Sequence, residues 1–189
     1  MLTDIVLGIQ HGDEGKGKVT HHLLKNGNYT HCIRFNGGCN AGHTIYHEGV
    51  KIVTHLIPAG VFFGVKSIIG PGCVVRADKF FEEIRMLEDH GIRTAGLVKI
   101  ASNAHITTID HVNEDRKDET IGTTKSGNGP AYRDKYARLG RRASDFSIFD
   151  KYVIDMYEEL GGTADVLMEG AQGFWLDVDW GDYPYVTSS

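Results

Sequence analysis

The sequence predicts an α/β protein with a mainly parallel central sheet flanked by helices and a small β-hairpin region. Three observations support this class. Short apolar runs of strand length alternate with segments of helical periodicity. A glycine-rich turn joins the first run to the first helical segment. The length of 189 residues, with 41% hydrophobic and 24% charged residues, suits one soluble globular domain. We therefore expect a single domain over residues 1–189.

The strands are expected where apolar or β-branched residues cluster between turn residues. They are Ile5–Ile9, Cys32–Phe35, Ile45–Tyr46, Ile52–Leu56, Ser67–Ile69, Cys73–Arg76, Leu97–Ala101 and Val166–Met168. The tetrapeptide Tyr46–Gly49 is typical of a hairpin turn between the third and fourth of these strands.

Four helices are expected, at Gly17–Lys25, Asp78–His90, Ala131–Leu139 and Phe146–Leu160. The second places Phe80, Ile84 and Leu87 on one face. The third lies in the polar region Thr120–Gly140, which is expected to be a loop leading into a helix. The fourth rests on apolar residues from Val153 to Leu160 at spacings of three and four.

Composition excludes several function classes. The net charge is −5 without a long basic run, so we expect no nucleic-acid partner. No apolar stretch reaches membrane-spanning length, and no secretion signal precedes the first strand, so we expect no membrane association. Cys32, Cys39 and Cys73 are odd in number without C-x-x-C spacing, which predicts reduced thiols in the cytoplasm.

The segment Gly8–Val19 is the most informative part of the chain. A glycine-rich turn between strand and helix presents backbone N–H groups at the positive end of a helix dipole, which binds phosphate. Residues 12–18 fit the first seven positions of the pattern G-x-x-x-x-G-K-[ST], which predicts a fold like that of P-loop NTPases. The eighth position is Val19, which lacks the hydroxyl that holds magnesium. Asp13 could take that task or act as a base, so we expect nucleotide chemistry.

A second glycine-rich loop, residues 36–44, follows the second strand. Loops at the carboxyl ends of neighbouring parallel strands converge, so Asp13 and His43 could form an acid–base pair across a substrate. The alternative for His43 is a hydrogen-bonded loop histidine. A zinc site with His47 is disfavoured, because the segment reads as strand and turn. His105 and His111 are expected at the surface.

Two further polar segments are candidates for ligand contacts. The loop 121–132 offers hydroxyls at Thr123, Thr124 and Ser126 for a phosphate or a ribose, or it is a flexible surface connection. The arginines after it form a solvated helix face, or one of them clamps a phosphate. Gln172, in a predicted turn after the last strand, has an amide that could recognise a purine edge.

These segments together resemble the adenylosuccinate synthetase family. The matching motifs are Gln10–Lys18, Asn40–Thr44, His55–Pro58, Ile121–Thr124 with Gly129–Ala131, Glu169–Gly173 and Tyr183–Ser189. The family joins IMP and L-aspartate using GTP, through a 6-phosphoryl-IMP intermediate. The resemblance implies a GTP-dependent ligase of AMP biosynthesis.

The resemblance also implies roles for individual residues. Asp13 would remove the N1 proton of the purine, His43 would donate to the phosphoryl oxygens or the leaving GDP, and Lys16 would neutralise the transferring charge. The GTP phosphates would contact Gly12, Gly15, Lys16, Gly17, Lys18, Gly42, His43 and Thr44. IMP would contact Asp13, Asn40, Thr124, Arg138, Gln172 and Thr187. Mg²⁺ would be held by Asp13 and the Gly42 carbonyl, and Arg138 would reach the neighbouring site of a homodimer.

The chain departs from the family in several places. His11, Cys39 and Lys125–Ser126 replace more familiar residues, and family members continue far beyond Ser189. The resemblance therefore implies the N-terminal part of a longer enzyme, without the aspartate and guanine sites. Three alternatives stay open: a truncated non-catalytic nucleotide-binding module, a viral relative acting on dGMP, and a phosphate-loop kinase. Asp13 argues for IMP over dGMP, and Val19 weakens the kinase.

Overall fold

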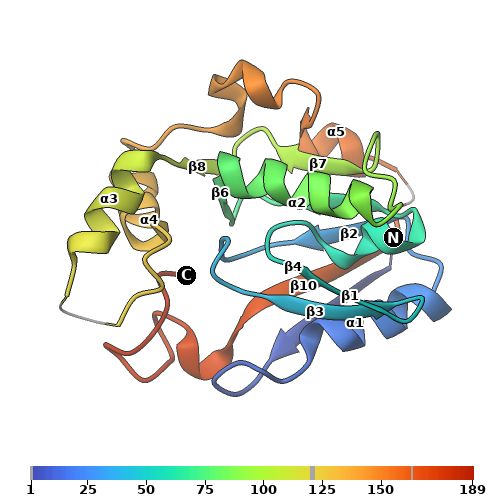
Figure 1. Ribbon diagram of the computed structural model, residues 1–189, viewed down its shortest axis with the longest axis horizontal. Coiled ribbons are helices and arrows are strands. Elements are labelled where there is room, and N and C mark those ends of the chain that lie inside the picture. The colour runs from blue at the N-terminus through green and yellow to red at the C-terminus, as the bar shows by residue number, and fades with distance from the viewer. Residues whose placement is uncertain (1, 120–121, 163) are drawn as a thin grey trace.

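A parallel sheet forms the centre of the computed structural model, which describes residues 2–119, 122–162 and 164–189 (Figure 1). In spatial order its strands are β1 (Thr3–Gly8), β10 (Val166–Gly173), β2 (His31–Arg34), β5 (Lys66–Ile69), β7 (Val98–Ala101) and β9 (Val153–Ile154). All five neighbouring pairs are parallel. The predicted fold class is confirmed, and the loops after β1, β2 and β10 leave the same edge of the sheet.

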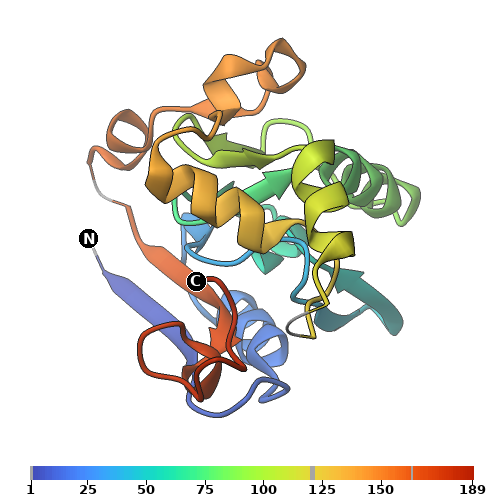
Figure 2. The same cartoon turned by 90° about the vertical axis from the view of Figure 1, so that its left-hand side faces the viewer.

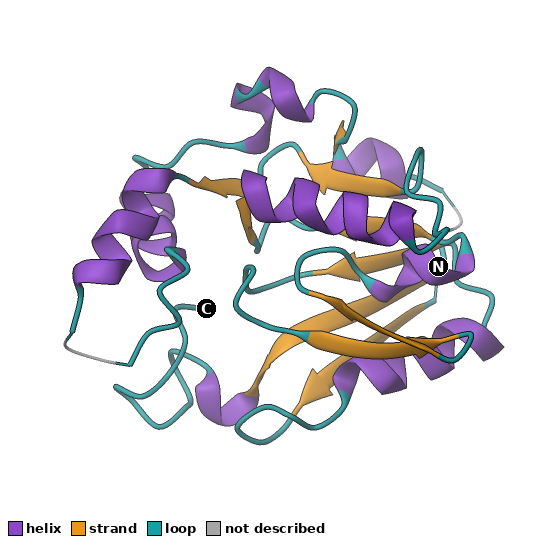
Figure 3. Ribbon diagram, in the orientation of Figure 1, coloured by secondary structure: helices purple, strands orange, loops and turns teal. Residues whose placement is uncertain are grey.

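Two smaller strand pairs accompany the sheet (Figure 3). β3 (His43–His47) and β4 (Val50–Thr54) form the predicted antiparallel hairpin. Glu48 and Gly49 between them have φ of 49° and 82°, as a two-residue hairpin turn requires. β6 (Val74–Arg76) and β8 (His105–Thr107) form a separate parallel pair, so the predicted strand Cys73–Arg76 lies outside the central sheet.

The helices flank these strands. They are α1 (Lys16–Asn26), α2 (Ala77–Asp89), α3 (Ile109–Lys117), α4 (Asn128–Ala137) and α5 (Met156–Leu160), with 3₁₀ turns at Ala59–Phe63, Ala143–Asp145, Ser147–Phe149 and Phe174–Leu176. α3 and α4 pack together at one end of the molecule (Figure 2). The C-terminal segment returns towards α4 in both views. None of the helices in the described ranges is long and apolar enough to cross a membrane.

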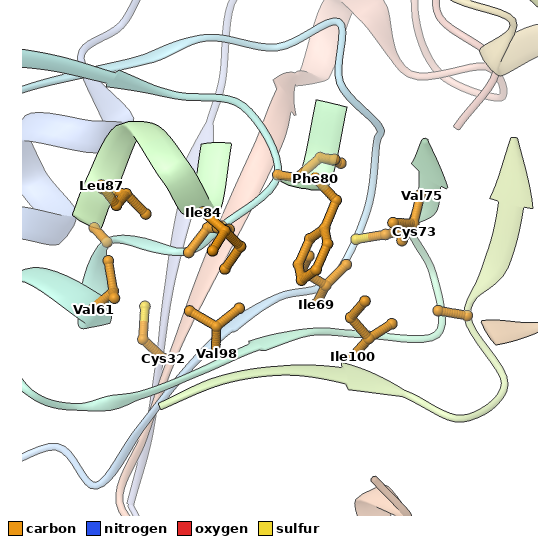
Figure 4. Packing of buried hydrophobic residues seen from close by; sticks show 14 of the residues in the cluster. Cys32, Val61, Ile69, Cys73, Val75, Phe80, Ile84, Leu87, Val98 and Ile100 are labelled. Carbon is orange, nitrogen blue, oxygen red and sulfur yellow. The ribbon is translucent and has the colours of Figure 1, made fainter. Parts of the chain in front are cut away.

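The main core lies between α2 and the sheet (Figure 4). Phe80, Ile84 and Leu87, predicted to share one helix face, pack against Val98 and Ile100 of β7. Phe80 and Leu87 have no exposed surface. Burial of such a side chain stabilises the fold by about 1.5–3 kcal/mol, so this face fixes α2 on the sheet.

The structure corrects two predicted elements. Phe146–Leu160 is not one helix, because Val153 and Ile154 pair with Ile100 and Ala101 at the sheet edge, and Asp155 then caps the short α5. β-Branched residues at a free sheet edge outweighed the helical spacing. The last strand also runs through Gly173, so Gln172 lies in β10 and not in a turn.

Candidate functional site

The glycine-rich loop between β1 and α1 has the conformation expected of a phosphate-binding turn. Gly12, Asp13 and Gly15 have φ of 98°, 61° and 78°, all in the left-handed region. Gly15 precedes the first residue of α1, Lys16, and its carbonyl accepts from the backbone N–H of Lys18 at 2.9 Å. The Asp13 side chain is exposed, whereas Lys16 is only 7% exposed. The loop thus presents its carboxylate outward and its first lysine inward.

Glu14 fills the inside of this loop. Its carboxylate accepts hydrogen bonds from the backbone N–H groups of Gln10 (3.0 Å) and Gly12 (3.2 Å) and from Lys16 Nζ (2.6 Å). Burial raises the pKa of this carboxyl, but the Lys16 hydrogen bond and the Gln10 N–H outweigh burial and bring it to about 2. Glu14 is therefore a permanent internal anion, held by the kind of donors that would bind a phosphate.

His43 lies directly against the first turn of α1. A Cβ placed on Gly17 would lie 3.1 Å from His43 Cβ, so a side chain at this position would require His43 to shift by a few tenths of an ångström. The His43 imidazole is 4% exposed, and its Nδ1 donates to Glu169 Oε1 of β10. Because a carboxylate only accepts, Nδ1 carries the proton. The buried Nε2 has no hydrogen-bond partner among the described residues, which leaves it for a ligand.

Glu169 orients this histidine from within the sheet. It has no exposed surface, and its second oxygen, Oε2, accepts from the Ala59 N–H at 3.0 Å. Burial raises the pKa of Glu169, whereas the charge and hydrogen bond of His43 and the charge of Arg34 lower it, and the net pKa is below its ordinary value. Glu169 thus fixes the tautomer and the orientation of the His43 imidazole.

A pocket of about 510 Å³ lies beside the loop, between α3, α4 and the C-terminal segment. Its lining includes four of the predicted IMP contacts: Asn40, Thr124, Gln172 and Thr187. Leu176 also lines the pocket, and a Cβ on Gly12 would lie 3.7 Å from its Cδ1. The phosphate loop therefore borders this pocket.

Tyr132 of α4 fixes the wall of the pocket that carries Asn40. Its hydroxyl accepts from the Gly37 N–H at 3.0 Å and is 2.8 Å from the Gly72 carbonyl, to which it donates. Gly37 has φ of 84°, and a Cβ there would lie 2.7 Å from Ala171 Cβ and 3.3 Å from Gln172 Nε2. This glycine lets the loop after β2 approach the end of β10.

The remaining predicted site residues are distributed as follows. Lys18 and Gly42 are exposed, and Thr44 lies in β3, paired with Val53. Arg138 caps the far end of α4, where it is exposed and does not line the pocket. Thr120 and Ile121, part of the predicted loop and of its motif, lie outside the described residues.

The histidine predictions need two corrections, and the first is that His105, in β8, is half-buried. His111 is 7% exposed rather than on the surface, because its Nδ1 accepts from the Thr108 N–H and its Nε2 is 3.1 Å from Asp134 Oδ2. His43 and His47 occupy the first and last positions of β3. Within the described ranges, no group of three or more His, Cys, Asp or Glu side chains is arranged to hold a metal ion.

Sequence reasoning assigned no task to Glu14 or Glu169, the two carboxylates that organise the site. Glu14 follows Asp13 directly, and periodicity does not say which of two adjacent acids turns inward. The signal for Glu169 was present, since it is an acid at the end of an apolar run, beside a loop that carries His43.

The fold and site define an α/β protein with a glycine-rich loop at the carboxyl edge of a parallel sheet, between its first strand and its first helix. The family model described as adenylosuccinate synthetase matches residues 5–160 and 146–189. The chain belongs to this family. Adenylosuccinate synthetases of Shouchella clausii and Listeria monocytogenes are 38% and 39% identical over 243 residues, covering 100% of this chain and 56% of their own length. The chain thus spans about half the length of the curated relatives it matches.

Solved structures agree with this assignment. The fully ligated adenylosuccinate synthetase of Plasmodium falciparum superposes with a TM-score of 0.86 at 33% identity, over 100% of this chain and 55% of that one. The succinoaminodeoxyadenylate synthetase of cyanophage S-2L, bound to dGMP and dATP as an energy donor, has a TM-score of 0.81 at 26% identity. That match covers 98% of this chain and 55% of that one.

Proposed function

We propose that this protein joins IMP and L-aspartate to adenylosuccinate with consumption of GTP, through 6-phosphoryl-IMP. The proposal is carried by one observation: the His43–Glu169 pair is buried against the first turn of α1, beside the loop that carries Asp13. A general acid, a candidate base and a phosphate-binding turn therefore share one edge of the sheet. Family membership supports the same reaction.

Three side chains divide the chemistry. Asp13 removes the N1 proton of IMP, so that O6 attacks the γ-phosphorus of GTP. His43, protonated and held by Glu169, donates from Nε2 to the phosphoryl oxygens or the leaving GDP. Lys16 and the loop N–H groups neutralise the transferring charge. The amino group of aspartate then displaces phosphate from the purine. Lys16 first has to exchange Glu14 for phosphate oxygens, since the two side chains are paired at 2.6 Å.

The pocket is proposed to hold IMP. Asn40, Thr124 and Thr187 bind its phosphate, and Gln172 contacts the purine. This assignment is supported by their common place in the pocket lining. Gln172 Nε2 is buried and has no hydrogen-bond partner among the described residues, as expected of a donor that binds a ligand.

Arg138 is proposed to complete the IMP site of a neighbouring subunit in a homodimer. The proposal is supported by its exposed position at the end of α4, away from the pocket of its own chain. We further propose a cytoplasmic protein, because all three cysteines are free thiols.

The donors in the loops fit a magnesium ion. Mg²⁺ prefers oxygen ligands and is usually bound by one or two protein oxygens together with phosphates. Asp13 supplies an exposed carboxylate, and the exposed Gly42 precedes His43, which lies against α1, so both loops meet at the first turn of α1. When bound, the ion supplies positive charge to the phosphate oxygens, while Asp13 and the Gly42 carbonyl hold it.

The decisive experiment follows product absorbance with IMP, L-aspartate and GTP. Asp13→Asn should lower kcat more than about 100-fold, since general base catalysis contributes at least that much. Asp110→Asn, an exposed change in α3, is the matched control and should be neutral. An Asp13→Asn rate within threefold of wild type removes Asp13 as the base.

The alternatives give different outcomes in the same assay. The observation behind the dGMP alternative is the fold that this chain shares with the cyanophage enzyme. A higher turnover with dGMP than with IMP would establish dGMP as the substrate. Calorimetry that shows nucleotide binding without any turnover would instead establish a non-catalytic module.

A further inference from the structure

Asn128, the first residue of α4, is a buried side chain that the proposed mechanism does not use. It is 7% exposed, and neither Oδ1 nor Nδ2 has a hydrogen-bond partner among the described residues. It lines the 510 Å³ pocket together with Asn40, Thr124 and Thr187. An unpaired buried amide costs free energy, so such a group in a pocket wall is expected to meet a ligand.

The position of this amide is fixed from two sides. A Cβ on Gly38 would lie 2.6–2.9 Å from the Asn128 carboxamide, so the missing side chain of Gly38 makes room for it. One helical turn further, Tyr132 is hydrogen-bonded to Gly37 and Gly72. Gly127, just before α4, donates its N–H to Asp115 Oδ2 at 2.8 Å. The first turn of α4 is therefore held rigidly against the loop after β2.

Hydrogen-bond donors surround Asn128, in a pocket that the acidic Glu114, Asp115 and Asp118 also line. α4 is ten residues long, and the N–H groups of its first turn lack intrahelical partners. Pro130 contributes no N–H, which leaves those of Asn128 and Gly129 at this end. A Cβ on Gly129 would lie 3.3 Å from Ser188 Oγ, so the hydroxyl-rich C-terminal segment faces the same turn. An amide donor, free N–H groups and hydroxyls together suit a phosphate.

We infer that Asn128 donates from Nδ2 to the phosphate of the bound nucleoside monophosphate, as a further binding residue. The inference rests on the proposed function. Asn128, at the start of α4, would be a fourth phosphate-binding residue beside Asn40, Thr124 and Thr187. Its Oδ1 stays free to accept from a neighbouring hydroxyl or from water.

Two substitutions of Asn128 separate a phosphate contact from other roles. Asn128→Ala removes the donor and should weaken IMP binding about 10- to 100-fold, the range for hydrogen bonds to charged groups. Asn128→Asp keeps the shape but sets a carboxylate against the phosphate, so it should weaken binding more than Asn128→Ala. Asn113→Asp makes the same charge change on the exposed side of α3 and should leave binding within twofold.

Calorimetry with IMP and with dGMP gives the answer, and thermal unfolding of each variant checks its fold. If Asn128→Asp binds as tightly as wild type or tighter, Asn128 faces a hydroxyl or only packs on Gly38, and the inference is wrong. If Asn128→Ala fails to fold, the isosteric Asn128→Asp and the smaller polar Asn128→Ser carry the test. A wild-type protein that binds neither nucleotide overturns the proposed function and this inference together. Normal IMP binding that survives Asn128→Asp overturns only the inference.

Discussion

Glu14 Oε2 accepts a hydrogen bond from Lys16 Nζ at 2.6 Å, so the phosphate loop closes around its own carboxylate. Glu14 also binds the Gln10 and Gly12 N–H groups. We expect Glu14→Gln to loosen the loop and to lower the thermal stability of the protein, because a neutral amide cannot replace a carboxylate between three donors.

The pH dependence gives the sharper test of this pair. The pKa of Glu14 falls from its ordinary 4.5 to about 2 in the fold. The contribution of ionised Glu14 to the free energy of unfolding is therefore complete above about pH 4.5 and is lost as the pH falls towards 2. Urea unfolding of wild type and Glu14→Gln should show a stability gap that narrows on acidification. A gap that is constant from neutral pH to about pH 3 would contradict the ion pair.

Gly173→Ala should displace the phosphate loop from the end of β10. A Cβ at this position would lie 2.0 Å from the Gln10 carbonyl oxygen and 2.7 Å from the Gly12 nitrogen. Such overpacking typically costs about 1–3 kcal/mol, and here the backbone of the loop has to move. We expect lower stability in urea and weaker GTP binding. Gly122→Ala is the control for stability, because a Cβ there has no described neighbour within 4 Å and its φ is unstrained.

The sequence predicted most of the helices and strands in which an apolar run is bounded by turn residues. β1, the β3–β4 hairpin and α2 each combine a periodic apolar face with clear turn residues at the ends. α3 was not predicted, because its sequence Ile109–Lys117 is almost wholly polar. It forms through a capping box of Thr108 and His111 and through packing against α4, which no local pattern displays.

Site residues on glycine-rich loops could be predicted, because the glycine positions indicate the backbone geometry. Site residues that act from the buried core were missed. Asp13 and His43 emerged because their loops were expected to follow neighbouring strands. β10 in fact lies between β1 and β2, but the three strands are parallel, so both loops still leave the same edge of the sheet. Arg34 did not emerge, although it has no exposed surface and lowers the pKa of Glu169 through its charge. Which charged residue turns into the core depends on contacts between segments far apart in the chain.

Glu169→Gln should lower kcat at least about 10-fold with little change in KM for IMP. The amide removes the negative charge beside the proposed acid His43 and has nearly the same size as the carboxylate. Steady-state kinetics separates the two constants. Glu158→Gln, an exposed change in α5, is expected to behave as wild type. A large rise in KM at unchanged kcat would show that Glu169 supports binding rather than proton donation.

Glu83 is buried like Glu169, but it has no role in the proposed reaction. It lies on α2 and accepts from the backbone N–H groups of His55, Leu56 and Ile57 at 3.0–3.1 Å. Burial raises its pKa from the ordinary 4.5 to about 7, although these three donors oppose the rise. The folded protein therefore binds a proton at Glu83 between these two pH values, where the unfolded chain does not.

Glu83→Gln should change how stability depends on pH. Since the pKa is raised in the fold, the contribution of a protonated Glu83 is complete below about pH 4.5 and is lost as the pH rises through about 7. The loss is on the order of 3–4 kcal/mol at ~1.4 kcal/mol per pKa unit. Glutamine does not titrate, and its NH₂ group faces one of the backbone N–H donors. Glu83→Gln should therefore be less stable than wild type at low pH. The difference in free energy of unfolding between the two proteins should narrow towards pH 7. Urea unfolding measures that gap, with the exposed Glu82→Gln expected to parallel wild type throughout. A gap that widens as the pH rises would mean that Glu83 is ionised in the fold, with its three N–H donors outweighing burial.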